Sequence, residues 1–232
     1  MPRPQRITDP STLETLARVK IDSLIPSQQA TAPSFLRSAN CYQQRFIKCA
    51  EICTFHCEPE FIHAILLELD PEVSVFVPQP FLLRIGRRRY TPDMYAMREG
   101  QAYVLELKPD GEFDPGLHQT LTPFFAHHGL IFDVVANETI MKRETEALHW
   151  LPLIQALVVA RDVDTQSEEG RIWQACCARS GTTQVGDFVH PGDRDRTMLS
   201  EVALHRLLHN GSLCADLSRA PFAYDTELRP CT

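Results

Sequence analysis

The order of helical and strand-like patterns between residues 58 and 156 constrains the fold of this chain most strongly. Glu58–Leu69 has apolar residues at helical spacing, and Pro59 suits a first helical turn. Turn residues separate the aliphatic, β-branched and aromatic runs that follow, which predicts strands at Val73–Val77, Phe81–Ile85, Tyr90–Met97 and Ala102–Leu107. The next elements are a predicted helix at Leu117–His127, a strand at Leu130–Val135 and a helix at Ile140–Ala156. This alternation predicts an α/β domain whose mixed β-sheet is flanked by helices.

The sequence on either side predicts an N-terminal extension and a small C-terminal domain. Residues 1–40 are rich in Pro, Ser and Thr, and a helix is expected around Thr12–Ser23, capped by Ser11 and Glu14. Residues 41–160 form the expected main domain, in which Gln44–Phe55 fits either a strand or a helix. The polar stretch Asp162–Gly170 is the expected linker. Residues 168–232 predict a small, mostly helical, winged-helix-like domain with helices at Ile172–Ala178 and Met198–His209 and a strand at Ser212–Leu217.

Two neighbouring strands bring together the residues with the clearest chemistry. Asp93 lies in the first of them, and Glu106 and Lys108 lie in the second, beyond a short turn. Glu106 and Lys108 are two residues apart, so a strand places both side chains on one face. The Asp93 and Glu106 carboxylates and the Leu107 carbonyl are oxygen donors of the kind that Mg²⁺ or Mn²⁺ prefers. The sequence therefore predicts a divalent metal site here.

The same residues predict phosphodiester hydrolysis. A metal lowers the pKa of bound water and neutralises the charge that develops on the phosphate. Lys108 can orient that water or stabilise the transition state. A third carboxylate is expected from the preceding helix, with Glu60 as the first candidate and Glu58 as the second. The simpler alternative is a solvated strand face beside a Pro-Asp turn, but a charge in a buried strand requires a partner or a metal.

Four arginines immediately before Asp93 form the densest positive group in the sequence. They are Arg84, Arg87, Arg88 and Arg89. Such a strip is suited to the DNA backbone beside an active site. The alternative is the solvated tip of a hairpin.

Composition limits the remaining possibilities. The net charge of −7 over 232 residues argues against a protein that coats nucleic acid by electrostatics alone, and indicates that partners supply DNA affinity. No apolar run reaches the roughly 20 residues that span a bilayer, and the N-terminus lacks the pattern of a secretory signal. We therefore expect a cytoplasmic protein. Cys49, Cys53, His56 and Cys57 have spacing that could suggest zinc, but no CxxC pair is present, which favours small buried thiols.

These motifs resemble the PD-(D/E)xK nucleases and, among them, the TnsA endonucleases of heteromeric cut-and-paste transposons. The resemblance covers about three quarters of the chain and is specific only in its combination of motifs. It is found in the phrases Cys57-Glu-Pro-Glu60, Leu66-Leu-Glu-Leu-Asp-Pro-Glu-Val73, Gln79-Pro80, Tyr90-Thr-Pro-Asp93, Leu105-Glu-Leu-Lys108, Gly129-Leu-Ile-Phe-Asp-Val-Val135 and Leu207-Leu-His-Asn-Gly-Ser-Leu-Cys-Ala-Asp-Leu217. The offset of the family's helix glutamate matches Glu60. This chain differs in having Glu106 where some members carry Gln, and Cys57 where a small polar residue is usual.

The resemblance implies a restriction-endonuclease-like fold and Mg²⁺-dependent nicking of the 5′ strands at the ends of a double-stranded transposon. It also implies a TnsB-like transposase that cuts and joins the 3′ strands, and a TnsC-like AAA+ regulator that contacts the C-terminal domain. Two alternatives stay open. One is a stand-alone PD-(D/E)xK nuclease of restriction or DNA repair, and the other is a non-catalytic adaptor for transposition assembly.

Overall fold

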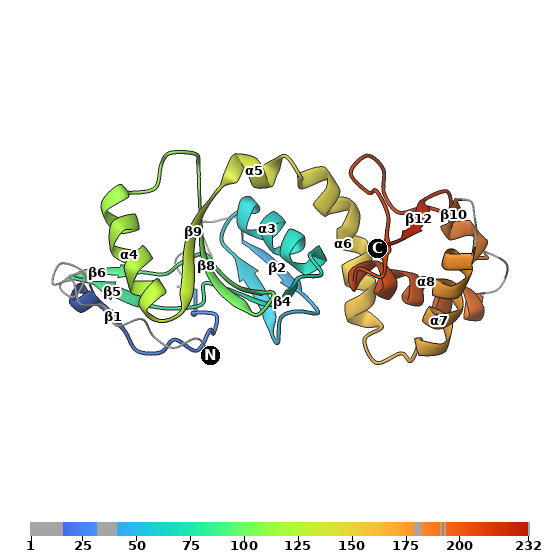
Figure 1. The fold of residues 1–232 in the computed structure, drawn as a ribbon, viewed down its shortest axis with the longest axis horizontal. Helices are drawn as coiled ribbons and strands as arrows, with labels where there is room; N and C mark the ends of the chain where they lie inside the picture. The colour runs from blue at the N-terminus through green and yellow to red at the C-terminus, as the bar shows by residue number, and fades with distance from the viewer. Residues whose placement is uncertain (1–15, 32–40, 179–181, 191, 193, 232) are drawn as a thin grey trace. The chain divides into compact units, whose positions relative to one another are not determined.

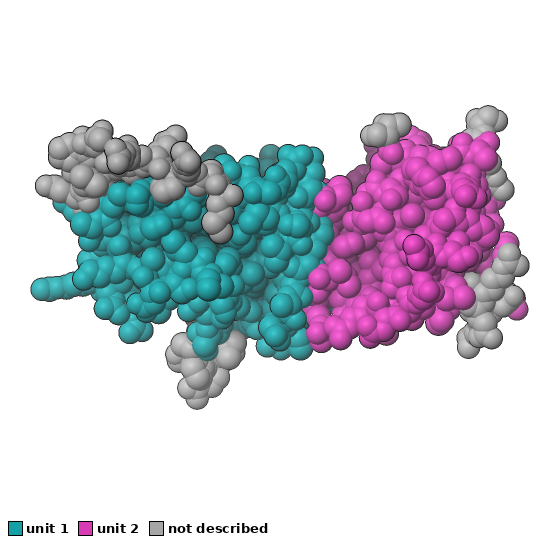
Figure 2. All heavy atoms as spheres, turned by 60° about the horizontal axis from the view of Figure 1, so that its bottom comes forward, with its two compact units in different colours: residues 1–44, 48–67, 72–142 teal, residues 45–47, 68–71, 143–232 magenta. Residues whose placement is uncertain are grey.

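The computed structural model describes residues 16–31, 41–178, 182–190, 192 and 194–231. It divides into two compact units, drawn in different colours in Figure 2. The first contains residues 1–44, 48–67 and 72–142, and the second contains residues 45–47, 68–71 and 143–232. The main domain predicted from the sequence extends further, to residue 160. The helix α6 (Glu144–Val159) belongs to the second unit because Trp150 and Leu153 are buried in that unit's core.

A mixed four-stranded sheet forms the centre of the first unit, so the predicted mixed α/β class is confirmed (Figure 1). Its order is β4 (Val73–Pro78), β7 (Met94–Arg98), β8 (Gln101–Lys108) and β9 (Leu130–Ala136). The first three strands are antiparallel, whereas β9 runs parallel to β8. Glu99 and Gly100 connect β7 to β8 with φ angles of 47° and 77°. Positive φ at both residues is typical of the tight type I′ turn, which fixes the register of these strands.

Two helices of the first unit agree with the sequence pattern. The helix α3 spans Glu58–Leu69, the predicted bounds, and its Ile62, Ala64 and Ile65 are almost completely buried. The helix α4 (Pro115–His127) connects β8 to β9, as a parallel strand pair requires. The Asp114 side chain caps α4 by accepting hydrogen bonds from the first-turn backbone. Leu121, Phe124 and Phe125 of α4 belong to the same buried cluster as Val104 and Phe132 of the sheet.

Three predicted helices and strands need correction. Residues 16–18 of the predicted helix Thr12–Ser23 are helical, residues 19–21 form β1 (Val19–Ile21), and residues 12–15 lie outside the described part. The strand is favoured because Val19 and Ile21 alternate with a polar residue and pair with β5 (Leu83–Ile85). The predicted strand Tyr90–Met97 is two strands, β6 (Arg88–Tyr90) and β7, since Pro92 has no amide hydrogen to donate. The predicted helix Ile140–Ala156 is likewise two helices, α5 (Asn137–Met141) and α6.

Two smaller sheets complete the first unit. The strands β1, β5 and β6 form one, in the order β1-β5-β6. The ambiguous segment before α3 forms a pair of strands, β2 (Tyr42–Arg45) and β3 (Ile52–Phe55).

The second unit combines helices with a small antiparallel sheet. The helices α6, α7 (Gln166–Ala178) and α8 (Arg194–His209) accompany the short 3-10 helix η1 (Val185–Asp187). The sheet order is β10 (Thr183–Gln184), β12 (Glu227–Pro230), β11 (Leu213–Cys214). The start of α7 lies within the segment Asp162–Gly170 that the sequence predicts to be a linker. Within the described residues, every helix is too short or too polar to cross a membrane.

Candidate active site

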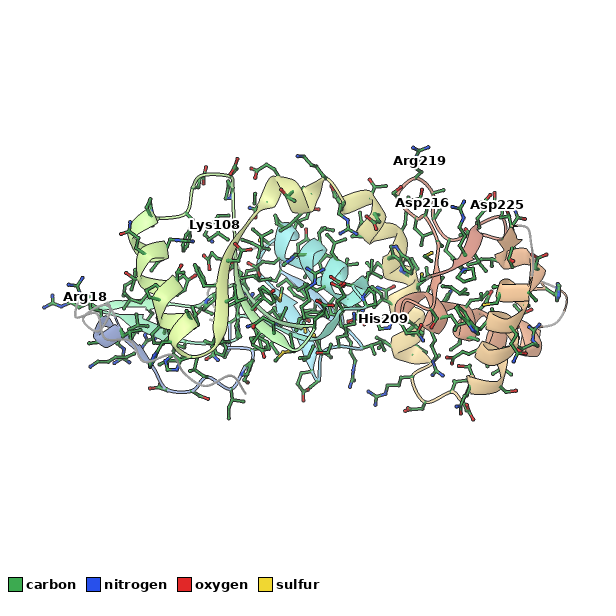
Figure 3. The ribbon with its side chains drawn as sticks, in the orientation of Figure 1. Arg18, Lys108, His209, Asp216, Arg219 and Asp225 are labelled. Atoms are coloured by element: carbon green, nitrogen blue, oxygen red, sulfur yellow. The ribbon has the colours of Figure 1, made fainter. Side chains whose placement is uncertain are left out.

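The register of β7 and β8 places Asp93 beside Glu106. Met94 pairs with Leu105, so Asp93, one residue earlier, stands opposite Glu106 at the end of the antiparallel pair. The Asp93 Oδ2 atom accepts a hydrogen bond of 2.8 Å from the Leu107 backbone N–H. Asp93 is therefore fixed by the backbone of the strand that provides the other site residues. Lys108 ends that strand and is labelled in Figure 3.

Three oxygen atoms converge on the Lys108 ammonium. Its Nζ lies 2.8 Å from Glu106 Oε1 and 3.6 Å from Asp93 Oδ2. It also donates a 3.1 Å hydrogen bond to the carbonyl oxygen of Leu107. These are the three donors that the sequence predicts for a divalent metal. In the structure, the lysine's own ammonium is the cation that these oxygens surround, so the donor set fits a hard cation.

A group of three protein carboxylates is not assembled at this point. Among the described residues, no group of three or more His, Cys, Asp or Glu side chains has a geometry that could hold a metal ion. A metal at this position would be held by Asp93, Glu106 and the Leu107 carbonyl, which combine two carboxylates with a backbone oxygen.

Burial disfavours the ionised forms of the Asp93 and Glu106 carboxylates. The Glu106 residue is only 3% exposed, and its pKa is raised by burial and by the Asp93 charge. Burial and the Glu60 charge also raise the pKa of Asp93, to about 6, even though Lys108 and the Leu107 amide oppose this shift. Burial lowers the pKa of Lys108, but the two carboxylates outweigh burial, and the net direction is upward. Such a buried group of carboxylates is stabilised by a cation.

Glu60 approaches the site from the first turn of α3. It is 6% exposed, and its Oε2 accepts hydrogen bonds from the His56 N–H (3.0 Å) and from Gln79 Nε2 (2.7 Å). Its Oε1 accepts a hydrogen bond from the Cys57 thiol at 3.4 Å. Burial raises the pKa of Glu60, and its charge in turn raises the pKa of Asp93. The structure thus brings Glu60 into electrostatic reach of Asp93, whereas Glu58 is exposed.

Sequence reasoning did not assign a role to Tyr90 or Gln79, which contact the site carboxylates. Tyr90 is 9% exposed and donates a hydrogen bond of 2.5 Å to Glu106 Oε2. Gln79 is 3% exposed and donates to Glu60. Gln79 could have been noticed as a polar residue between Pro78 and Pro80 at the end of an apolar strand.

The four arginines lie on the hairpin of β5 and β6, which ends at Tyr90. Arg84, Arg87, Arg88 and Arg89 are all exposed. Arg84 pairs directly with Arg89 across this hairpin and with Lys20 of β1 on its other side. Like charges placed opposite each other destabilise a sheet, and an anion bound over them relieves the repulsion. Lys20 was not among the predicted cations, because its pairing with β5 depends on a contact between distant parts of the chain.

The cysteine cluster does not share one centre. The Cys49 thiol donates to the Phe76 carbonyl, and the Cys53 thiol donates to the Glu51 carbonyl. Cys57 is directed at Glu60, and burial together with that carboxylate raises the pKa of its thiol to about 12.

Neither the models of known protein families nor the sequences of curated proteins match this chain.

Proposed function

We propose that this chain is a metal-dependent DNA endonuclease that nicks the 5′ strands at transposon ends as a subunit of a heteromeric cut-and-paste transposase. The proposal depends above all on one observation: oxygen atoms of Asp93, Glu106 and Leu107 surround one ammonium group at a strand end. Glu60 on the preceding helix and the mixed sheet support a restriction-endonuclease-like fold. The resemblance to TnsA endonucleases narrows the function from nuclease to transposon endonuclease.

Each site residue has a separate task in this proposal. Bound Mg²⁺ or Mn²⁺, held by Asp93, Glu106 and the Leu107 carbonyl, would supply an acidified water and positive charge at the phosphate. Lys108 gives up its carboxylate contacts and donates hydrogen bonds to the water or to a phosphate oxygen. Tyr90 orients Glu106 through its hydroxyl. Glu60 adds a third negative charge that favours cation binding.

The cationic strip provides the first contact with DNA. Arg84, Arg89 and Lys20 stand side by side across three strands, and Arg87 and Arg88 lie at the adjoining turn. Cations in such a row suit the phosphates of a duplex, which fix position without reading sequence. Tyr90 ends the hairpin and contacts Glu106, so the hairpin that carries the strip is linked to the candidate active site by one residue.

Partner proteins of the complex supply the DNA affinity and the regulation that this chain lacks. With a net charge of −7, the chain relies on a TnsB-like transposase for most of its affinity for the transposon ends. We assign contact with a TnsC-like AAA+ regulator to the second unit, whose helices and small antiparallel sheet support a winged-helix-like module. We assign the protein to the cytoplasm, where DNA and these partners are accessible.

A strand-specific nicking assay on end-labelled transposon-end DNA tests the proposal. It compares the wild-type chain, Lys108→Ala and Asp93→Ala, each with Mg²⁺ and with or without the neighbouring transposase. Lys142→Ala changes an exposed lysine at the end of α5 and is the matched control. We expect partner-dependent 5′ nicks for the wild type and the control only.

Other results would redirect the assignment. Cleavage that ignores the transposase would indicate a free-standing restriction or repair nuclease. If the wild type cuts no strand under any condition, the enzymatic assignment is wrong and the adaptor role remains. An Asp93→Ala variant that cuts at the wild-type rate would remove Asp93 from the site.

A further inference from the structure

Gln79 has an unusual backbone for its residue type. Its φ is +41°, in the left-handed region that favours glycine, although it carries a long side chain that is almost fully buried. Residues held in this region persist only where their surroundings fix them, and they cluster at functional sites. The feature therefore requires a physical reason for keeping glutamine at this position.

The backbone of Gln79 is fixed from two directions. Its N–H donates to the Asp93 carbonyl at 2.9 Å, which ties it to the segment that carries the site aspartate. Its own carbonyl accepts a hydrogen bond of 3.0 Å from the Gln29 N–H. The neighbouring Pro80 carbonyl accepts one of 3.1 Å from Ser27. Residues 27–29 of the N-terminal segment thus form a strap along Gln79 and Pro80.

The side chain of Gln79 belongs to a chain of hydrogen bonds. At both ends of this chain, the donor and acceptor roles are fixed. At one end, Gln28 uses its amide to donate to the Thr54 carbonyl (2.6 Å) and to accept from the Thr54 N–H (3.2 Å). Backbone groups cannot exchange these roles, so the Gln28 amide has one orientation. Gln28 Nε2 also donates to Gln79 Oε1 at 2.8 Å.

At the other end, the acceptor is Glu60. Glu60 Oε2 also accepts a hydrogen bond from the His56 backbone N–H, so this oxygen is an acceptor, and the Gln79 amide presents its NH₂ group to it at 2.7 Å. Gln28 requires the opposite end of the same amide to be the oxygen. The two requirements agree, and each amide in the series can adopt only one orientation.

We infer that Gln79 is a positioning residue of the metal centre, which holds the Glu60 carboxylate in a fixed orientation beside Asp93. The inference rests on the proposed function and adds to it a role for the N-terminal strap. Gln79 acts through Glu60 by a charge-assisted hydrogen bond, and through Asp93 by its backbone N–H. The positive φ directs both groups toward the site at once.

A purely structural role predicts a different result. If Gln79 only satisfied buried polar groups, its loss would change stability and leave cation affinity unchanged. Gln79→Gly separates the two possibilities, because glycine adopts positive φ without strain and keeps the backbone N–H but has no amide side chain. Gln28→Ala is a second variant, which leaves Gln79 in place but removes the group that orients it. Gln29→Ala is the matched control on the strap, since the Gln29 side chain donates to backbone carbonyls and not to Glu60.

The test uses the full chain and MnCl₂ as the probe. Binding is measured by calorimetry, thermal unfolding is measured in EDTA, and nicking is measured with the neighbouring transposase present over a range of Mg²⁺ concentrations. We expect Gln79→Gly to bind Mn²⁺ about 10- to 100-fold more weakly than the wild type while it remains folded. The Mg²⁺ concentration for half-maximal nicking should rise by a similar factor. Gln28→Ala should change both quantities in the same direction by less, and Gln29→Ala should match the wild type.

The failure of this inference and that of the proposed function give different results. If the wild type binds Mn²⁺ and nicks DNA, and folded Gln79→Gly does so with the same affinity, Gln79 has no positioning role and the endonuclease proposal stands. Equal losses in Gln29→Ala and Gln79→Gly would also overturn it, because they would indicate a general effect of the strap. A wild-type chain that neither binds Mn²⁺ nor nicks DNA would overturn both.

Discussion

Replacing Asp93 with asparagine should stabilise the metal-free protein at neutral pH while abolishing cleavage. The Asp93 side chain is 16% exposed, and burial together with Glu60 disfavours its ionised form. Asparagine has nearly the same shape, carries no charge, and can still accept the hydrogen bond of the Leu107 N–H. The substitution therefore removes a charge that destabilises the fold in the absence of metal.

The expected size follows from the pKa. The pKa of Asp93 is about 6 in the folded protein, against an ordinary value of 3.8. At about 1.4 kcal/mol for each tenfold change in proton affinity, ionised Asp93 lowers the free energy of unfolding by on the order of 3 kcal/mol. Because the folded state binds the proton more tightly, wild-type stability falls as the pH rises from about 4 to about 6. The advantage of asparagine should be small near pH 4 and complete above pH 7.

The measurement is urea unfolding in EDTA at pH 4.5 and pH 7.5. Both tryptophans, Trp150 and Trp173, lie in the second unit, so their fluorescence does not report on the site. Circular dichroism should be combined with hydrogen exchange of residues 94–108. Saturating Mg²⁺ should stabilise the wild type and leave Asp93→Asn unchanged. An asparagine variant that is less stable at pH 7.5, or whose advantage does not depend on pH, would refute the reasoning.

Three further outcomes are expected. Tyr90→Phe removes the buried hydrogen bond to Glu106, so nicking should slow about 10-fold and the free energy of unfolding should fall by about 1–3 kcal/mol. A nicking time course for the variant that matches the wild type would exclude a role for the hydroxyl. Arg84→Gln combined with Arg89→Gln should weaken duplex binding and reduce the salt slope of log K by about 2, measured by fluorescence anisotropy at several salt concentrations; equal slopes would show that the strip does not contact phosphates. Gly211→Ala should destabilise the second unit by about 1 kcal/mol or more, because φ is +75° and a proline carbon lies 2.9 Å from the new Cβ; tryptophan fluorescence during urea unfolding reports this, and Mn²⁺ binding by the first unit should not change.

Local pattern was enough for several elements and for the relation among three site residues. The bounds of α3 follow from apolar spacing and from Asp70-Pro71, which ends the helix. The two-residue period of a strand places Glu106 and Lys108 on one face. A tight turn at Glu99-Gly100 then places β8 alongside β7, the strand that begins directly after Asp93. These relations depend only on residues close in sequence, and they are therefore readable without the fold.

The remaining features of the fold and of the site depend on contacts between segments that are far apart in the sequence. Residues 19–21 are a strand because β5 offers a pairing edge that no local pattern reveals, and this pairing alone places Lys20 beside Arg84. The contact of Gln79 with Glu60 and of Tyr90 with Glu106 depends on side-chain direction across separate elements. The raised pKa of Asp93 arises from burial, which is a property of the assembled core. The residue types that carry the chemistry, and the local geometry they share, can be predicted from the sequence because periods and turns act over a few residues. Their surroundings require the folded chain, because burial and hydrogen-bond partners come from segments far apart in the chain.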